Sequence, residues 1–281
     1  MKVGGTPRAE NGFTIVETLI VLAVTGLLFI SAVILISGRA NKTQFTTSAN
    51  DLKQQFEQII NEASSGYFPD SGSFTCTSTP PIMPKLKDGA QKQGTNGGCV
   101  FLGKAVQLGV PTFPDKILVF AIAGNRLNST GDEASTLHEA MPEAIAPGNG
   151  FNNTSLTGIT QDLQLESGLA PAWAKADGTP VAGFAMLSTL ASYSTSCNGI
   201  CSGAQTLQLY GVKGTAVNAT DHLQFADKLD ADPNYVPAKQ ITACFNSGTT
   251  SNQSALYTIG GSSGSAQGVA VDIQIQSGAC S

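Results

Sequence analysis

An uninterrupted apolar run near the N-terminus limits what this chain can fold into more than any other feature does. From Phe13 to Ile36 the sequence reads FTIVETLIVLAVTGLLFISAVILI, which is 24 residues with one charged side chain, Glu17. A helix of that length spans about 36 Å, whereas the hydrocarbon core of a bilayer is about 30 Å thick. We therefore predict that residues 13–36 form a transmembrane helix.

A cleaved secretory signal peptide is the alternative interpretation of this run. It fits poorly, because the run is longer than an ordinary signal-peptide core. Glu17 is the unusual residue, since a carboxylate at the centre of a membrane span costs on the order of 2.5 kcal/mol, and somewhat less near an end. It either lies in the water-rich interface or needs a cationic partner within the membrane or a helical assembly.

The pattern changes after this run, but no proline intervenes. An amphipathic stripe follows at helical spacing, made of Phe45, Ala49, Leu52, Phe56, Ile59 and Ala63. This part contains no proline, and Gly66 stands where a helix C-cap is expected. We predict one helix over residues 13–65, roughly 80 Å long, whose second part, residues 37–65, presents one apolar face to a globular domain.

The start of the apolar run resembles a known processing signal. Gly12 is followed by FTIVETLI, which puts an aromatic residue directly after the glycine and Glu17 four residues later. This segment resembles the prepilin signature of type IV pilins and type II secretion pseudopilins, in which a short basic leader ends in glycine. The resemblance implies that residues 1–12 are a leader, which prepilin peptidase removes by cutting between Gly12 and Phe13.

Two further roles follow from the same resemblance. Prepilin peptidase would methylate the new amino terminus on Phe13, and Glu17 would pair with the N-terminal amine of a subunit during assembly. The family thereby supplies a cationic partner for this carboxylate. One departure is Ile34, which stands where many major pilins have a proline that loosens the helix. Gly26 and the pair Ser37–Gly38 still permit local unwinding.

Six cysteines follow the apolar run: Cys76, Cys99, Cys197, Cys201, Cys244 and Cys280. Metal sites usually need two close cysteine pairs or paired histidines, but Cys197 and Cys201 are the one close pair, and His138 and His222 stand alone. We therefore predict disulfides in an oxidising compartment rather than metal ligands or free thiols. Nearest-neighbour pairing, one of several connectivities, gives 76–99, 197–201 and 244–280. The cysteines also place this part of the chain outside the cytoplasm.

Residues 67–281 form an extracellular head in this interpretation. Short apolar runs, typical of β-strands, recur at 99–108, 117–123, 181–187, 206–212, 241–245, 256–259 and 269–275. The last run alternates apolar and polar residues, which predicts a half-buried strand. Three aromatic residues suit the core as well as a functional role: Phe120, Trp173 and Phe184. The polar connectors 124–180 and 213–238 are expected to be loops.

The predicted fold class is α+β. A long N-terminal α-helix, transmembrane in its first half, packs by its second half on a disulfide-containing, mainly antiparallel β head. The head carries no motif of a nucleophilic, zinc-protease or phosphate-binding site. His138 beside Glu139, and His222 after Asp221, are adjacent charged residues of the kind found on solvated loops. We expect no enzyme activity, no cofactor and no metal.

One segment has part of a calcium-binding pattern. Asp230, Asp232 and Asn234 match the first ligand positions of an EF-hand loop. Tyr235 stands where glycine is needed, and Ile241 stands where the bidentate glutamate belongs. An EF-hand is therefore excluded, and a looser calcium loop stays the alternative.

Nucleic-acid binding would need a cluster of exposed cationic side chains. The formal net charge is −5, and Arg126 is the only arginine beyond the predicted helix. The densest basic patch in the head, made of Lys85, Lys87 and Lys92, is small. No nucleic-acid partner is favoured, although DNA is kept as the runner-up ligand.

Together, the resemblance and these exclusions predict a structural subunit of a type IV pilus that serves adhesion or twitching motility. A minor or tip pilin is favoured, because the mature chain of 281 − 12 = 269 residues is large for a repeating unit. The residues around Cys76, Gln93–Asn96, Cys99 and Phe101–Lys104 are also similar to the heads of GspH/FimT-type pseudopilins. The alternatives are the major pilin, a type II secretion pseudopilin and a DNA-uptake pilin.

Partners and location follow from this prediction. The expected partners are other pilin subunits, prepilin peptidase, the pilus assembly platform and motor, and the membrane before assembly. The chain is then expected in the cytoplasmic membrane with its head outside, and later in an extracellular fibre.

Overall fold

A computed structural model describes most of the chain. The described residues are 14–65, 74–79, 82–88, 99–108, 115–145, 160–166, 168–188, 207–213, 235–248, 252–260 and 269–280. They form two helices and fourteen strands. The chain divides into two compact units, Met1–Thr43 and Gln44–Ser281. Helix α1 contributes to both units, and all the strands belong to the second.

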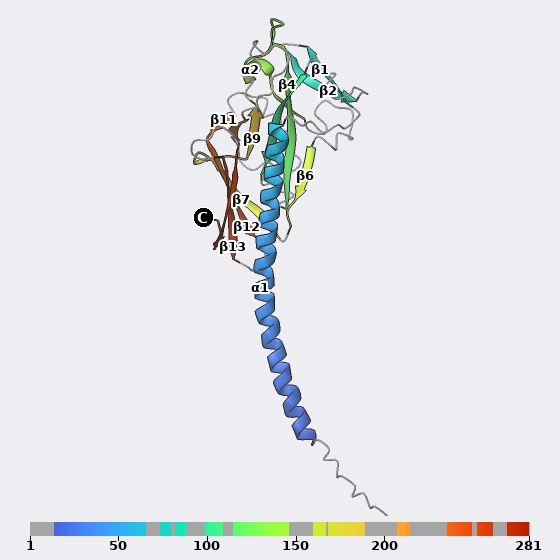
Figure 1. Ribbon diagram of the computed structural model, residues 1–281, viewed down its shortest axis with the longest axis vertical. Coiled ribbons are helices and arrows are strands. Elements are labelled where there is room, and N and C mark those ends of the chain that lie inside the picture. The colour runs from blue at the N-terminus through green and yellow to red at the C-terminus, as the bar shows by residue number, and fades with distance from the viewer. Residues whose placement is uncertain are drawn as a thin grey trace, which may run out of the picture. The chain divides into compact units, whose positions relative to one another are not determined.

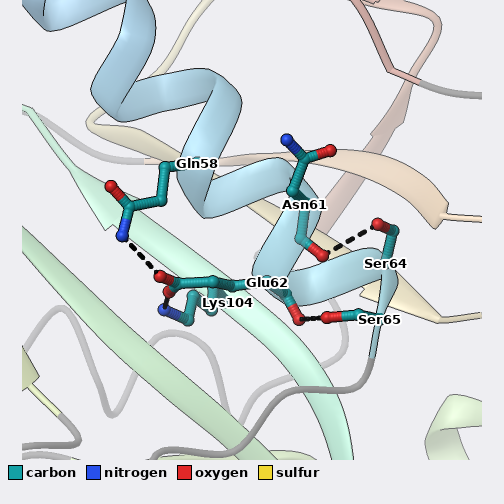
Figure 2. Close-up of polar contacts among 6 residues, drawn as sticks. All are labelled: Gln58, Asn61, Glu62, Ser64, Ser65 and Lys104. Carbon is teal, nitrogen blue, oxygen red and sulfur yellow. Dashed lines mark hydrogen bonds and ion pairs between the residues drawn. The ribbon is translucent and has the colours of Figure 1, made fainter.

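Helix α1 runs from Ile15 to Ser64 and contains 50 residues. The single helix predicted from the sequence is therefore confirmed, apart from its terminal residues. Its last turn is closed by serine hydroxyls: Ser64 Oγ donates to the carbonyl of Asn61 at 3.0 Å, and Ser65 Oγ donates to the carbonyl of Glu62 at 3.1 Å (Figure 2). The Glu62 carbonyl is one that a helix end leaves without an intrahelical donor, whereas the Asn61 carbonyl also accepts from the backbone N–H of Ser65 at 2.9 Å. Gly66, the expected C-cap, lies outside the described residues.

The N-terminal part of α1 has the properties of a membrane-spanning segment. Residues Ile15–Ile34 have a mean hydropathy of 2.3, and this stretch is long and apolar enough to cross a bilayer. Its hydroxyl groups bond to carbonyls within the helix: Thr18 to Ile15, Thr25 to Val21 and Leu22, and Ser31 to Leu28. Such bonds let hydroxyls enter lipid without leaving their donors unsatisfied.

The strands of the second unit form three sheets in which every pairing among the described residues is antiparallel. The two-stranded sheet pairs β1 (Phe74–Thr79) with β2 (Ile82–Asp88). The seven-stranded sheet has the order β11-β10-β9-β3-β4-β5, with β6 also paired to β4. Its strands are β3 (Cys99–Gln107), β4 (Lys116–Asn125), β5 (Glu143–Ile145), β6 (Thr160–Gln164), β9 (Gly183–Ser188), β10 (Leu207–Val212) and β11 (Tyr235–Ala238).

The five-stranded sheet has the order β14-β13-β12-β7-β8. Its strands are β7 (Leu169–Ala176), β8 (Thr179–Pro180), β12 (Gln240–Ser247), β13 (Gln253–Gly260) and β14 (Val271–Ser277). A short second helix, α2 (Leu137–Ala140), precedes β5. The predicted α+β class, with a helix on antiparallel sheets and a disulfide, is confirmed.

The main core lies where the C-terminal part of α1 meets the two larger sheets (Figure 1). The predicted stripe is buried, with each member at most 2% exposed: Phe45, Ala49, Leu52, Phe56, Ile59 and Ala63. The ring of Phe56 makes edge-on contacts with Phe184 of β9, at 6.1 Å between centroids, and with Tyr257 of β13, at 5.6 Å. One helix residue thus packs against both sheets at once.

The opposite face of the seven-stranded sheet carries a second apolar cluster that includes Leu102, Ala105 and Phe120. Neighbouring strand residues point to opposite faces, so Val106 faces α1 and Ala105 faces away from it. Phe120 and Phe184 are thus core residues. Trp173 differs, because it is half-buried and the ammonium of Lys175 lies 4.3 Å from its ring centroid.

All seven strands predicted from apolar runs are present, as β3, β4, β9, β10, β12, β13 and β14. In β14 the predicted alternation is also confirmed, since Val271 is buried while Asp272, Gln274 and Gln276 are exposed. The two apolar positions between them, Ile273 and Ile275, are half-buried. The last apolar run is therefore the half-buried strand that its period indicates.

The prediction that 124–180 is a loop is wrong, and the prediction for 213–238 is wrong at its C-terminal end, while residues 214–234 lie outside the described residues. The first connector contains α2 and four strands, β5 to β8, and the second contains β11. In β7 the inward positions include Ala174 and Ala176, whose small side chains give a weak alternating signal. The short strands β5, β6 and β11 form because they pair with longer strands, β4 and β10. A local sequence pattern does not predict such pairing.

The disulfide between Cys244 and Cys280 joins β12 to the residues that follow β14, as nearest-neighbour pairing predicts. Cys99 is also disulfide-bonded, and no cysteine in the described part of the chain is free. The partner of Cys99 stays a prediction, with Cys76 in β1 as the expected one. Cys197 and Cys201 lie outside the described residues.

Candidate functional site

The predicted processing segment begins outside the described residues, which start at Thr14. Gly12 and Phe13 therefore keep their predicted roles as the cleavage and methylation positions. Glu17 is described, and it lies in the first turn of α1. Its position on a helix near the start of an apolar span agrees with the sequence pattern, while its pairing with a neighbouring amine stays a prediction.

Thr14 and Glu17 form a reciprocal pair at the start of α1. The backbone N–H of Glu17 donates to Thr14 Oγ1 at 3.3 Å. In return, the backbone N–H and the hydroxyl of Thr14 each donate to Glu17 Oε2 at 3.4 Å. The Thr14 carbonyl accepts the first i+4 bond, from Thr18 N at 3.2 Å. This is a capping box, in which an N-cap hydroxyl and the carboxylate three residues later satisfy each other's backbone donors.

The capping box changes what Glu17 does in the isolated chain. A carboxylate in the first turn also interacts favourably with the partial positive charge of the helix N-terminus. Glu17 is therefore partly compensated by its own helix before any other subunit is present. Sequence reasoning identified Glu17 and missed Thr14, although the Thr-x-x-Glu spacing is itself the known signature of this cap.

A second polar arrangement fixes the other end of α1 to the head. The ammonium of Lys104 in β3 pairs with Glu62 Oε2, and Gln58 Nε2 donates to Glu62 Oε1 at 2.8 Å (Figure 2). Lys104 is 2% exposed and the Glu62 side chain 17%. A buried charge is tolerated when it is paired and hydrogen-bonded, so this contact specifies how α1 lies on β3.

A glycine at a β-bulge lies beside this ion pair. The register of β3 against β4 shifts between Phe101 and Gly103, and Gly103 has a φ of +152°. A Cβ at this position would collide with the backbone carbonyl of Met186 in β9. Only glycine fits there without displacing β9. The bulge also determines the face of the sheet to which the Lys104 side chain points.

The histidine and acidic pairs considered in the sequence give no catalytic site among the described residues. Glu139 caps the short helix α2, because its Oε2 accepts from Ser135 N at 2.7 Å and Ser135 Oγ at 2.9 Å. His138 lies in α2, and no metal-binding group of histidine, cysteine or acidic side chains occurs in the described residues. His222 and the segment 230–234 lie outside them.

Several basic residues of the head lie in the part of the chain that the structure describes. Arg126 is half exposed and pairs with Glu133 at 3.5 Å. Lys85 and Lys87 lie in β2, and Lys92 is outside the described residues. These positions add no argument for nucleic-acid binding.

The comparisons with known proteins bear on the N-terminal segment. Residues 7–33 match the family model for the prokaryotic N-terminal methylation motif. The chain carries a prepilin methylation motif. No curated protein and no solved structure matches the chain. The motif spans the predicted cleavage position, the capping box and most of the apolar part of α1, and pilin-family proteins that bear it are structural subunits rather than enzymes.

Proposed function

We propose that this pilin-like chain is a minor or tip subunit of a type IV pilus. Prepilin peptidase removes residues 1–12 and methylates Phe13, and the mature chain waits in the cytoplasmic membrane with its head outside. An assembly platform and motor then move it into a surface fibre used for adhesion or twitching motility. In the fibre, Glu17 pairs with the N-terminal amine of a neighbouring subunit.

The observation that carries this proposal is the methylation motif at the start of a helix with two different halves. Residues 7–33 match the motif, and Ile15–Ile34 is suited to lipid. The same helix ends as part of a disulfide-bonded β head. A chain built this way is held by lipid before assembly and displays its head outside, as a fibre subunit requires.

Replacing Gly12 with leucine tests the processing step. We expect an uncleaved precursor that stays in the membrane, because a bulky side chain occupies the position before the cut. Gly5→Leu, within the leader but away from the cut, is the matched control and should be processed. Mass spectrometry of the N-terminus reads the result, and normal processing of Gly12→Leu would contradict the proposal.

Replacing Glu17 tests the assembly step. Glu17→Ala should be cleaved normally but be absent from sheared fibres, because no carboxylate meets the incoming amine. Glu17→Gln keeps the size of the side chain and removes its charge, so it should fail in the same way. Assembly of either variant at the wild-type level would show that charge pairing is not required.

The place of the subunit within the fibre is tested by its abundance. Mass spectrometry of purified surface fibres should find the mature chain at a small fraction of the main subunit. Abundance equal to that of the main subunit would instead make it the major pilin. Absence from fibres, together with a protein-secretion defect on deletion, would make it a type II secretion pseudopilin. That outcome would agree with the similarity of the segment around Phe101–Lys104 to GspH/FimT-type heads.

A further inference from the structure

The contacts at the start of α1 point to a role for Thr14 that the methylation motif alone does not assign. We propose that Thr14 is a positioning residue for Glu17: it holds one carboxylate oxygen and leaves the other for the N-terminal amine of a second subunit. This inference rests on the proposed fibre function and names the device that prepares Glu17 for it.

The two carboxylate oxygens of Glu17 have different surroundings. Both contacts from Thr14, from its N–H and from its hydroxyl, reach Oε2. Oε1 accepts no hydrogen bond from the residues that the structure describes. An ionised carboxylate has about four acceptor positions on its two oxygens, so the cap occupies one oxygen while the other keeps its capacity for a further donor.

The cap also restricts where the carboxylate lies. A glutamate side chain in a helix has several rotamers, some of which extend sideways from the helix axis. The bond to the backbone N–H of Thr14 draws the carboxylate back over the first turn, toward the end of the helix where Phe13 begins. In a parallel bundle of such helices, the amine of a neighbour arrives at this level. Thr14 therefore reduces the conformational freedom that Glu17 would otherwise lose at assembly.

The same arrangement serves the chain before assembly. No second subunit is then available, and the carboxylate lies near the start of an apolar span. Hydrogen bonds to an ionised group lower the penalty of taking it out of water. Because the cap comes from the chain itself, it operates at any subunit concentration, and because it uses Oε2 it does not have to be broken when the amine binds.

The experiment compares Thr14→Val with Thr14→Ser in the full mature chain. Valine has nearly the shape of threonine but no hydroxyl, whereas serine keeps the hydroxyl. Hydrogen–deuterium exchange of the Glu17 amide in lipid nanodiscs measures the cap, and the amount of variant in sheared fibres per cleaved chain measures assembly. We expect Thr14→Val to speed exchange about fivefold, the factor of a typical lost N-cap, and to reduce incorporation severalfold. Thr14→Ser should keep the wild-type exchange rate and the wild-type level of incorporation.

Three results would overturn the positioning role. Unchanged amide exchange in Thr14→Val would mean that the hydroxyl does not hold the turn. Faster exchange with wild-type incorporation would mean that the cap exists but does not prepare Glu17 for assembly. Failure of Thr14→Ser to restore what valine removes would mean that the hydroxyl is not the determinant. The parallel Glu17→Ala variant separates these results from failure of the fibre proposal, since normal assembly of Glu17→Ala would refute the charge pairing itself.

Discussion

The two parts of helix α1 share one backbone but are built for different surroundings. In Ile15–Ile34 the large apolar side chains are exposed around the helix, and each is at least 48% accessible. From Phe45 to Ala63 the apolar side chains form a single stripe that is buried against two sheets. The backbone satisfies its own hydrogen bonds in both parts, so the pattern of side chains alone decides which solvent each part requires.

The charged residues of the two parts differ in the same way. Glu17 is compensated locally by Thr14, three residues away. Glu62 is compensated by Lys104, which lies 42 residues away in another element. The first part of the helix can therefore form before the head folds, whereas the packing of the second part depends on the folded sheets. Substitutions matched across the two parts test this contrast directly.

The largest expected effect comes from the aromatic residues of α1. Phe56→Ala should lower the free energy of unfolding of the head by about 4 kcal/mol, because it removes a buried ring that packs on both sheets and leaves a cavity. Phe29→Ala makes the same change at a residue that is 71% exposed, and it should leave head unfolding unchanged. Urea titration of the detergent-solubilised chain, read by the fluorescence of Trp173, measures both. Equal effects would refute the division between the two parts.

The next prediction separates the contribution of the disulfide to the stability of the head from the contribution of side-chain packing. Removing the Cys244–Cys280 bond with a pair of serine substitutions should cost about 3–4 kcal/mol, since a loop of this length then gains chain entropy on unfolding. The span between the two cysteines is 36 residues. The helix content of Ile15–Ile34 in lipid should not change, and circular dichroism at intermediate urea checks this. A loss of membrane-part helicity at the same urea concentration would contradict the independence of the two parts.

At the ion pair between Lys104 and Glu62, a single substitution should destabilise the head much more than the double substitution does. Lys104→Met should cost about 3 kcal/mol, because it leaves the Glu62 carboxylate without its cation in a poorly hydrated position. Adding Glu62→Met should recover most of that loss, since two apolar side chains of similar size remove both charges. The measurement is again urea unfolding, in a double-mutant cycle. Lys53→Met on the partly exposed Lys53–Glu57 pair is the control, with an expected cost under about 1 kcal/mol.

Much of the helix was predictable because its signals are local. The apolar run, the stripe and the lack of proline fix α1 to within a residue or two of its observed limits. The capping box was also present in the sequence, as Thr14 and Glu17 at the required spacing. It was missed because Glu17 invites a search for a distant cation, when its partner is three residues away.

The parts of the head that were not predicted depend on distant residues. Strand β7 is alanine-rich and is defined by pairing with β12, which lies some 65 residues further along the chain. The role of Lys104 was equally hidden, since a lysine in an apolar run gives no sign that it will be buried. Its partner, Glu62, belongs to the exposed-looking positions between the members of the stripe. Long-range pairings of this kind cannot be derived from composition or period.

The smallest expected effect concerns Tyr257, whose hydroxyl donates to the Ala49 carbonyl of α1 at 2.8 Å. Tyr257→Phe should cost about 1 kcal/mol at neutral pH, the net value of one hydrogen bond. Burial raises the pKa of Tyr257 well above its usual value of 10.0. The stability that this protonated hydroxyl contributes is therefore complete below pH 10 and is lost as the pH rises further, because the unfolded chain releases the proton first.

This pH dependence distinguishes Tyr257 from a residue that merely fills space. Above pH 10 the wild-type head should lose stability by up to about 1.4 kcal/mol per pH unit from this group, and Tyr257→Phe should remove that part of the slope. Burial also raises the pKa of Tyr210, so this residue contributes its own part of the alkaline slope of stability against pH. The variant Tyr210→Phe is the control, because it should remove that part and leave the part due to Tyr257. If the alkaline slope survives Tyr257→Phe unchanged, the hydroxyl does not link β13 to α1 in the folded head.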